Sequence, residues 1–458
     1  MKTIDVLLTE TCLRQKEKTA LREKVGNVWA ETSYASLLQQ ARQVASGLQA
    51  HDFAAGGHAA ILAPSSSRWV ITYFGILLAG GIIVPVDKEL KATELKHVLS
   101  DCAAQVIFTT HSYLDVLLEI KKDLPQLQRI ILIDQRRQKS PQNRKVFATI
   151  GELVKEWHLI REEFHLPRER TAALEKLADE IYHLLLPEEG STGKEKTGSD
   201  LFAPLNRLRQ KLTQQIELLN FEDLQGAEPP RSPSRQTQAV AIILYTSGTT
   251  GRSKGAMLSH ANIISNMRGA CQLFQLNQDM HTLSFLPINH VFEQVCGILL
   301  PLSLGGTVSF AESLKKLVPA VFRVFYDRIM KTVQGQAFSR LLYRLPLTKP
   351  LVAAKIRKKL GENTTFISGG AALDPEIARG FRELGVKILQ GYGITETSPV
   401  VSAEPPQAPK LGTVGPPLED VQVRINHPNA EGVGEILIRG PNVMLGTPLL
   451  GRMKKLRN

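Results

Sequence analysis

The sequence predicts an α/β protein: a large N-terminal domain of mostly parallel sheets covered by helices, with a small β-subdomain near the C-terminus. The large domain is predicted because short apolar segments such as Ile82–Val86 alternate with helical segments, and because Gly-rich stretches follow several of them. The small subdomain is predicted because Val421, Val423 and Ile425 alternate with polar residues beyond Gly412.

The composition is that of a globular protein with more than one domain. The chain has 458 residues, of which 43% are hydrophobic and 22% charged, enough for two or three domains and a large core. Its four cysteines are scattered without metal-ligand spacing, which favours a reducing compartment. Lys2, Asp5 and Glu10 interrupt the apolar residues at the N-terminus and argue against a signal peptide. We therefore expect a cytoplasmic protein.

Residues 1–150 are predicted to form strand–helix units. Serines 65–67 can cap a helix that starts near Arg68, and Thr93 can cap a helix that extends to about Asp101. Residues 69–86 carry no charge, but Gly80 and Gly81 favour a buried helix, a turn and a strand over a membrane span. Four apolar segments are typical of short buried strands: His58–Ala63, Ile82–Val86, Gln105–Thr109 and Arg129–Asp134.

Residues 151–236 have a different pattern, which predicts a helical insertion followed by a linker. Two amphipathic helices are indicated, one by Leu174, Leu177, Ala178, Ile181 and Leu185, the other by Leu205, Leu208, Leu212, Ile216 and Leu219. We expect a helical hairpin on the surface, and a lid or membrane-docking element is the alternative. The chain would then comprise an N-terminal α/β subdomain (1–150), this insertion (151–236), a nucleotide- and acyl-binding α/β subdomain (237–405), a small β-subdomain (406–446) and a tail (447–458).

The most informative stretch is an apolar strand followed by small polar residues. Ala239–Tyr245 is rich in Ile and Val, and residues 246–255 hold three Gly, three Thr, two Ser, one Arg and one Lys. Glycine lets backbone N–H groups approach an oxyanion, hydroxyls add donors, and Lys254 adds a full charge. The stretch therefore predicts phosphate binding. It is neither a Walker A loop nor a dinucleotide fingerprint, because the required Gly-Lys-Ser/Thr and Gly-x-Gly-x-x-Gly orders are absent.

A second Gly-rich region follows two strands of one predicted strand–helix–strand unit. The first predicted strand, Thr365–Ser368, is followed by Gly369, Gly370 and Ala371. Asp374 and Pro375 can then start a helix that ends near Leu384. The second strand, Val386–Leu389, is followed by the loop Gln390–Glu396. Parallel strands bring such loops to one edge of a sheet, where ligands of open α/β sheets bind.

These segments carry a resemblance to a known family. YTSGTTGRSKG resembles the signature loop of the adenylate-forming superfamily, and SGGAAL and QGYGITETSP resemble further signatures of it. Within that superfamily the chain looks most like a long-chain fatty acid–CoA ligase. The resemblance implies that Lys254 holds the β- and γ-phosphates of ATP, Tyr392 stacks on adenine, Thr395 contacts the α-phosphate and Glu396 binds Mg²⁺. The implied nucleotide site comprises Thr246, Ser247, Gly248, Thr249, Thr250, Gly251, Lys254, Gly369, Gly370, Ala371, Gly391, Tyr392, Gly393 and Thr395.

The segment Phe285–Phe310 resembles the part of long-chain ligases that lines the acyl pocket, where Leu-Pro-x-x-His is typical. By this resemblance His290 helps to position the carboxylate, beside apolar Phe292, Val295 and Leu299. A structural histidine is the alternative. His260, in the first turn of a helix that Ser259 can cap, is expected to be structural. The implied ligands are ATP, Mg²⁺, a long-chain fatty acid and CoA.

The chain departs from the family pattern at two places. Val318, Pro319 and Phe322 follow residues 312–317 without the segment that usually intervenes. Beyond Gly446 we find neither the expected Tyr-x-Thr-Gly-Asp segment nor a C-terminal domain with a catalytic lysine, and neither Lys454 nor Lys455 should be given that role. We expect a chain truncated before the C-terminal domain. The chain would be a fragment, the product of a frameshifted gene, or a protein that no longer carries out catalysis.

The expected activity is ATP-dependent conversion of a long-chain fatty acid to acyl-adenylate and then to the CoA thioester, with the second step in doubt. The alternatives are a non-catalytic remnant that binds ATP or acyl groups, and a ligase for another carboxylate or for acyl carrier protein. The net charge is +12, and residues 312–361 hold twelve Lys or Arg and two acids. This segment suggests peripheral contact with membrane phospholipids, or else a solvated helical face. No nucleic-acid module accompanies it, so we expect no nucleic-acid partner.

Overall fold

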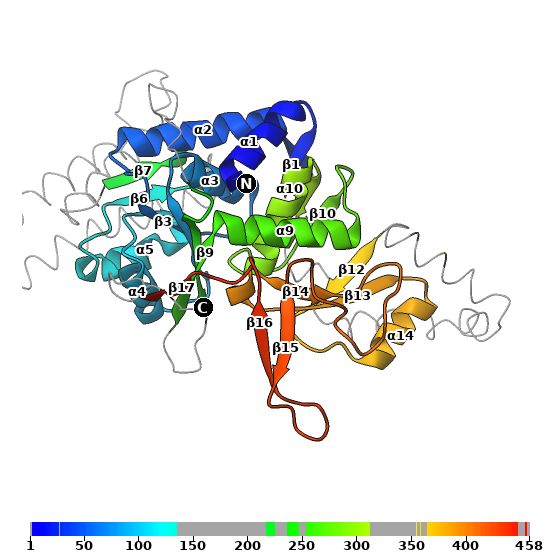
Figure 1. Ribbon diagram of the computed structural model, residues 1–458. Helices are drawn as coiled ribbons and strands as arrows, with labels where there is room; N and C mark the ends of the chain where they lie inside the picture. Colours follow the sequence, from blue (N-terminus) through cyan, green and yellow to red (C-terminus); the bar gives the residue numbers. More distant parts are fainter. Residues whose placement is uncertain are drawn as a thin grey trace, which may run out of the picture. The chain divides into compact units, whose positions relative to one another are not determined.

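The computed structural model describes residues 2–26, 28–134, 217–224, 236–246, 253–311, 354, 358, 364–447 and 454–455. The chain divides into two compact units. One comprises Met1–Gln105 with Leu224–Asn458, and the other Val106–Asp223. The described elements are those of an α/β protein, as the sequence predicts, and each unit is described by itself (Figure 1).

The larger unit contains a mixed sheet built around parallel strands. Strands β3 (His58–Leu62), β4 (Ile82–Pro85) and β8 (Val240–Thr246) are parallel neighbours. Strand β9 (Lys254–Ser259) is antiparallel to β8, and β17 (Gly446–Thr447) is antiparallel to β9. The backbone of β18 (Lys454–Lys455) pairs with β17.

A second sheet of this unit has the order β10, β11, β1, β2. Strands β10 (His281–Ser284), β11 (Thr307–Phe310) and β1 (Thr19–Val25) are parallel, and β2 (Val28–Ser33) is antiparallel to β1. The helices of this part are α1 (Ile4–Arg14), α2 (Tyr34–Ala50), α3 (Ser67–Leu78), α4 (Ala92–Asp101), α9 (His260–Phe274), the π-helical turn η3 (Glu293–Leu299) and α10 (Leu300–Leu304).

The uncharged stretch 69–86 is a buried helix, a turn and a strand, as predicted. All residues of α3 except Arg68 are buried, Gly80 makes the turn at φ +86°, and β4 follows. Ser66 caps α3, which confirms a serine cap. Within the part of the chain that the structure describes, no helix has the length and apolar character needed to cross a membrane.

The predicted cap of the next helix is wrong. Helix α4 begins at Ala92, and Lys91 occupies the cap position, so Thr93 already lies in the first turn. The Glu94 side chain accepts a hydrogen bond from the Lys91 N–H (3.0 Å), which satisfies the helix start two residues earlier than expected.

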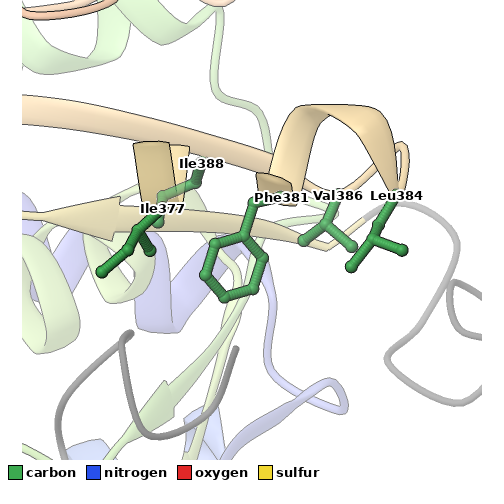
Figure 2. Close-up of a cluster of buried hydrophobic side chains, with 5 residues drawn as sticks. All are labelled: Ile377, Phe381, Leu384, Val386 and Ile388. Carbon is green, nitrogen blue, oxygen red and sulfur yellow. The ribbon is translucent and has the colours of Figure 1, made fainter. Parts of the chain in front are cut away.

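Strands β12 (Thr365–Ser368) and β13 (Lys387–Gly393) are parallel and are joined by α14 (Pro375–Glu383), which confirms the predicted strand–helix–strand unit (Figure 1). The Asp374 side chain caps α14 by accepting from the Glu376 N–H (2.8 Å). Figure 2 shows the cluster that holds α14 on this sheet, in which Phe381 packs among Ile377, Leu384, Val386 and Ile388.

The C-terminal β-subdomain is confirmed as an antiparallel hairpin. Strands β15 (Gln422–Asn426) and β16 (Glu435–Arg439) pair with Val423 opposite Ile438 and Ile425 opposite Ile436. The bounds of β15 lie within one residue of the alternating segment, Val421 to Ile425, that predicted it.

The second unit has the parallel strands β5 (Val106–Thr109), β6 (Arg129–Leu132) and β7 (Glu217–Asn220), with α5 (His111–Ile120) and the short 3₁₀ helices Lys121–Asp123 and Phe221–Asp223. The helix predicted over Leu205–Leu219 is wrong at its end, because Leu219 pairs with Ile131 in a strand. Strand pairing with β6 overrides the helical periodicity there. Residues 151–216 and 225–235 of the predicted insertion lie outside the described residues, and the five-part division of the chain stays a prediction.

Candidate nucleotide site

The predicted phosphate stretch lies at the end of the β8–β9 hairpin. Thr246 at the end of β8 pairs with Lys254 at the start of β9, and the Lys254 side chain is exposed. Ser247, Gly248, Thr249, Thr250 and Gly251 lie outside the described residues. Because the Lys254 ammonium group is exposed, it can bind an anion without first having been buried as an unpaired charge, which would be costly.

The second Gly-rich region joins the ends of β12 and β13. Ser368 pairs with Gln390, and a Cβ added to Gly369 would lie 3.5 Å from the Gly391 carbonyl oxygen. Gly370 has φ +80°, a conformation that favours glycine. Gly369 and Gly391 therefore lie next to each other, as the strand–helix–strand prediction expected, and Gly370 and Ala371 follow Gly369 directly in the chain.

The predicted loop Gln390–Glu396 is wrong in its first half, because residues 390–393 continue strand β13. Strand β14 (Val400–Ala403) is antiparallel to it, with Tyr392 opposite Ser402. The buried Glu404 carboxylate also accepts from the Gln390 N–H (2.9 Å) and from Arg382 Nη2 (3.1 Å). Hydrogen bonds from residues 400–404 keep residues 390–393 extended. The sequence pattern does not connect these two segments. Tyr392 is thus carried by a strand, half-buried.

Thr395 and Glu396 lie on the single 3₁₀ turn η4 (Thr395–Thr397), and both are half-buried. The Thr397 hydroxyl donates to the Pro399 carbonyl (2.7 Å) and accepts from the Ile394 N–H (3.2 Å). A Cβ at Gly393 would lie 2.0 Å from the Pro399 carbonyl oxygen, so only glycine fits at the start of this turn.

Buried amide side chains, which sequence reasoning missed, hold the turn in place. Asn266 donates to the carbonyls of Thr397 (3.2 Å) and Val400 (2.7 Å), and Asn442 donates to the same two carbonyls at 3.0 and 3.2 Å. Asn262, one turn before Asn266 on α9, donates to the carbonyls of Pro441 (2.7 Å) and Val443 (2.9 Å). The available signal was a pair of asparagines four residues apart on the buried side of a helix.

The segment 444–446 connects the Glu396 turn to the Lys254 strand. The Met444 N–H donates to the Glu396 carbonyl (2.8 Å), the Leu445 N–H donates to the Met257 carbonyl (2.9 Å), and Gly446 pairs with Met257 in β9. Helix α9 follows β9 directly and supplies Asn266, which bonds to the turn, and Asn262, which bonds to the segment just before residue 444. The structure therefore brings together the elements that carry Lys254 and Glu396.

His290 lies apart from this network. It is exposed, and in the described part of the chain its ring has no hydrogen-bond partner. Its backbone N–H donates to the Pro287 carbonyl (3.0 Å), in the turn before η3, and Val295 and Leu299 are buried just beyond it. His260 is fully buried and its Nδ1 accepts the Ile4 N–H (3.2 Å), as expected of a structural histidine.

Two buried polar residues next to His290 were also missed. Burial raises the pKa of Glu293 to about 7, and the side chain is 3% exposed. The amide of Gln294 is 1% exposed and has no hydrogen-bond partner among the described residues. Both lie in a π-helical turn, a feature that often marks functional sites. The signal available in the sequence was an acid and an amide inside an apolar stretch.

Comparison with known proteins identifies the family. Residues 8–446 match the model of the AMP-binding enzymes. The chain therefore belongs to the AMP-binding enzyme family, the adenylate-forming superfamily that the signature segments resemble.

Individual relatives are distant. The chain is 24% identical over 493 residues to a long-chain-fatty-acid–CoA ligase, ACSBG1, of Bos taurus, covering 97% of this chain and 59% of that one. It is 26% identical over 465 residues to the long-chain-fatty-acid–CoA ligase FadD15 of Mycobacterium bovis, covering 92% of this chain and 64% of that one. The chain thus spans about 60% of the length of these relatives.

A solved structure shares the fold. ATP-bound MatB from Rhodopseudomonas palustris superposes with a TM-score of 0.62 at 21% identity, over 98% of this chain and 72% of that one. This similarity supports the α/β fold already described.

Proposed function

We propose that this chain binds ATP and a long-chain fatty acid and forms the acyl-adenylate, releasing pyrophosphate. The observation that carries the proposal is the connection of the Lys254 strand and the Glu396 turn through segment 444–446. Family membership and the two fatty-acid ligases among the relatives support it.

The chemistry needs alignment and charge neutralisation more than a reactive side chain. A carboxylate is a poor acyl donor, because its leaving group would be an oxide. Attack of one carboxylate oxygen on the α-phosphorus breaks the bond to pyrophosphate and leaves AMP as a good leaving group. Lys254, with the residues 246–251 beside it, would hold the β- and γ-phosphates, and Thr395 would contact the α-phosphate.

The adenine would lie at the neighbouring edge. We propose that Gly369, Gly370, Ala371, Gly391 and Gly393 let the backbone approach the nucleotide, with Tyr392 stacking on the base. His290 would orient the carboxylate of the fatty acid, a role that its exposed ring and the apolar residues beyond it support.

Glu396 would hold a Mg²⁺ ion that arrives with the phosphates. No group of three or more His, Cys, Asp or Glu in the described ranges can hold a metal ion by itself. A single half-buried carboxylate fits Mg²⁺, which often uses one or two carboxylates together with substrate phosphates. The ion would neutralise charge on the triphosphate.

The acceptor and the membrane contact are further parts of the proposal. CoA is proposed as the acceptor because both relatives named above are fatty-acid–CoA ligases. The basic segment 312–361 is proposed to contact phospholipid, and apart from Ala354 and Lys358, both exposed, it lies outside the described residues.

The test is pyrophosphate exchange into ATP. We expect exchange driven by hexadecanoate in the presence of Mg²⁺, and little exchange with benzoate. Exchange with benzoate alone would overturn the fatty-acid assignment. Bound nucleotide without any exchange would indicate a non-catalytic remnant.

A further inference from the structure

Helix α4 contacts both strands of the β8–β9 hairpin through two side chains. His97 Nε2 donates to the Ser253 carbonyl (3.1 Å), immediately before β9, and Tyr245 Oη in β8 donates to Asp101 Oδ2 (2.6 Å). His97 and Asp101 are four residues apart and so lie on one face of the helix. A carbonyl only accepts, so His97 Nε2 carries a proton in this contact.

The strand register separates these contacts from the predicted ligand groups. Tyr245 pairs with Gly255, and Thr246 pairs with Lys254. Successive residues of a strand point to opposite faces, so the Tyr245 side chain leaves one face while Thr246 and Lys254 leave the other. Gly255 has no side chain and keeps the Tyr245 face open. Helix α4 can therefore hold the hairpin from one face without obstructing Lys254.

The placement of Asp101 is unfavourable for the helix alone. It is the last residue of α4, where a negative charge opposes the helix dipole. Its short bond to the Tyr245 hydroxyl gives the carboxylate a partner outside the helix. Burial raises the pKa of Tyr245, and the carboxylate contact raises it further, so the hydroxyl keeps its proton and remains a donor.

We propose that His97 and Asp101 form a two-point clamp that positions the end of the β8–β9 hairpin, and with it Thr246 and Lys254, for the triphosphate. The clamp residues act through Ser253 and Tyr245 and are positioning residues. The identity of the ligand, a triphosphate, rests on the proposed function, whereas the contacts that form the clamp do not.

The test uses His97→Leu, which removes the donor, and His97→Gln, whose amide can still donate to the Ser253 carbonyl. Tyr245→Phe removes only the second contact. Controls are His281→Leu, which removes a hydrogen bond to Ser309 (2.7 Å) within the other sheet of this unit, and Tyr34→Phe, which removes one from helix α2 to the Gly306 carbonyl (2.6 Å) beside that sheet. Hydrogen exchange of residues 244–246 and 253–256 reports the hairpin directly.

We expect His97→Leu and Tyr245→Phe to speed exchange at these amides by about fivefold, the effect of losing one hydrogen bond. They should also raise the KM for ATP with little change in that for the fatty acid. His97→Gln should restore the wild-type rate of hydrogen exchange and the wild-type KM for ATP, and the two control variants should change neither quantity. An unchanged rate of hydrogen exchange in the hairpin, or an unchanged KM for ATP in an active enzyme, would overturn the clamp. If the wild type neither binds ATP nor exchanges pyrophosphate, the proposed function fails while hairpin exchange still decides the clamp.

Discussion

The side-chain amide of Asn266 donates to the backbone carbonyl of Thr397 at 3.2 Å, across 131 residues of sequence. The same amide donates to the Val400 carbonyl (2.7 Å), and its Oδ1 accepts the Val400 N–H (3.4 Å). One buried side chain on α9 therefore holds the end of the turn that carries Thr395 and Glu396 and the start of strand β14.

Asn266→Asp should destabilise the protein, because the carboxylate keeps the shape but cannot donate to two carbonyls. We expect a loss of about 2–3 kcal/mol in the free energy of unfolding, the cost of leaving buried polar groups unpaired. Denaturant unfolding measures it, and pyrophosphate exchange should fall with it. Asn220→Asp, at an exposed hydrogen bond to Asp223 in the other unit, is the matched control and should change stability much less. Equal stability of both variants would contradict a holding role for Asn266.

Gly393→Ala should disrupt the Glu396 turn, whereas Gly369→Ala should leave the fold intact. A Cβ at Gly393 would lie 2.0 Å from the Pro399 carbonyl, but one at Gly369 would only touch the Gly391 carbonyl at 3.5 Å. We expect a loss of roughly 3 kcal/mol or more for Gly393→Ala. Thermal unfolding of the two variants side by side is the measurement. Similar melting temperatures for the two variants would mean that the turn adapts more freely than its contacts suggest.

Glu293→Gln should gain stability relative to the wild type as the pH rises from 5 to 7. Burial raises the pKa of Glu293 from its ordinary 4.5 to about 7, so the folded protein retains a proton that the unfolded chain has lost. Wild-type stability therefore falls with rising pH in this window, and glutamine removes that dependence. The difference in the free energy of unfolding should grow by about 2 kcal/mol between pH 5 and pH 7. Urea titrations at several pH values measure it, and a constant difference would argue against a buried, protonated Glu293.

Arg382→Met should be strongly destabilising, since it leaves the Glu404 carboxylate buried without its cation. Glu404 is 3% exposed and accepts from Arg382 Nη2 at 3.1 Å. We expect a loss of roughly 3 kcal/mol. The double variant with Glu404→Gln should recover part of it, because a neutral amide can still accept the Gln390 N–H. A double-mutant cycle by urea unfolding tests this, and purely additive losses would mean that the pair is not coupled.

Lys254→Ala and Glu396→Ala test the proposed site directly. The first should raise the KM for ATP in the exchange assay, and the second should remove most of the Mg²⁺ dependence. Lys358→Ala, an exposed lysine in the basic segment, is a suitable control for the loss of a positive charge. If both site variants exchange pyrophosphate like the wild type, the proposed roles are wrong.

The sequence by itself determined the α/β class, the strand–helix–strand unit around α14, the C-terminal hairpin and the family. These follow from local information: side-chain periodicity, capping residues such as Ser259 and Asp374, and contiguous signature segments. Its failures at Leu219 and Gln390–Gly393 lie where another segment supplies the backbone partner. At Thr93 the reason is local, because the Glu94 side chain bonds to the Lys91 N–H and starts the helix earlier.

Only the tertiary structure decided how the signature segments are joined. Asn266 and Asn442 hold the Glu396 turn, and Asn262 holds the backbone on either side of Asn442. Segment 444–446 connects that turn to the Lys254 strand, and His97 and Asp101 hold the hairpin from α4. These contacts link residues as far apart in the sequence as Met257 and Leu445. No local pattern encodes such pairs, because burial and backbone hydrogen bonding select them only once the chain has folded.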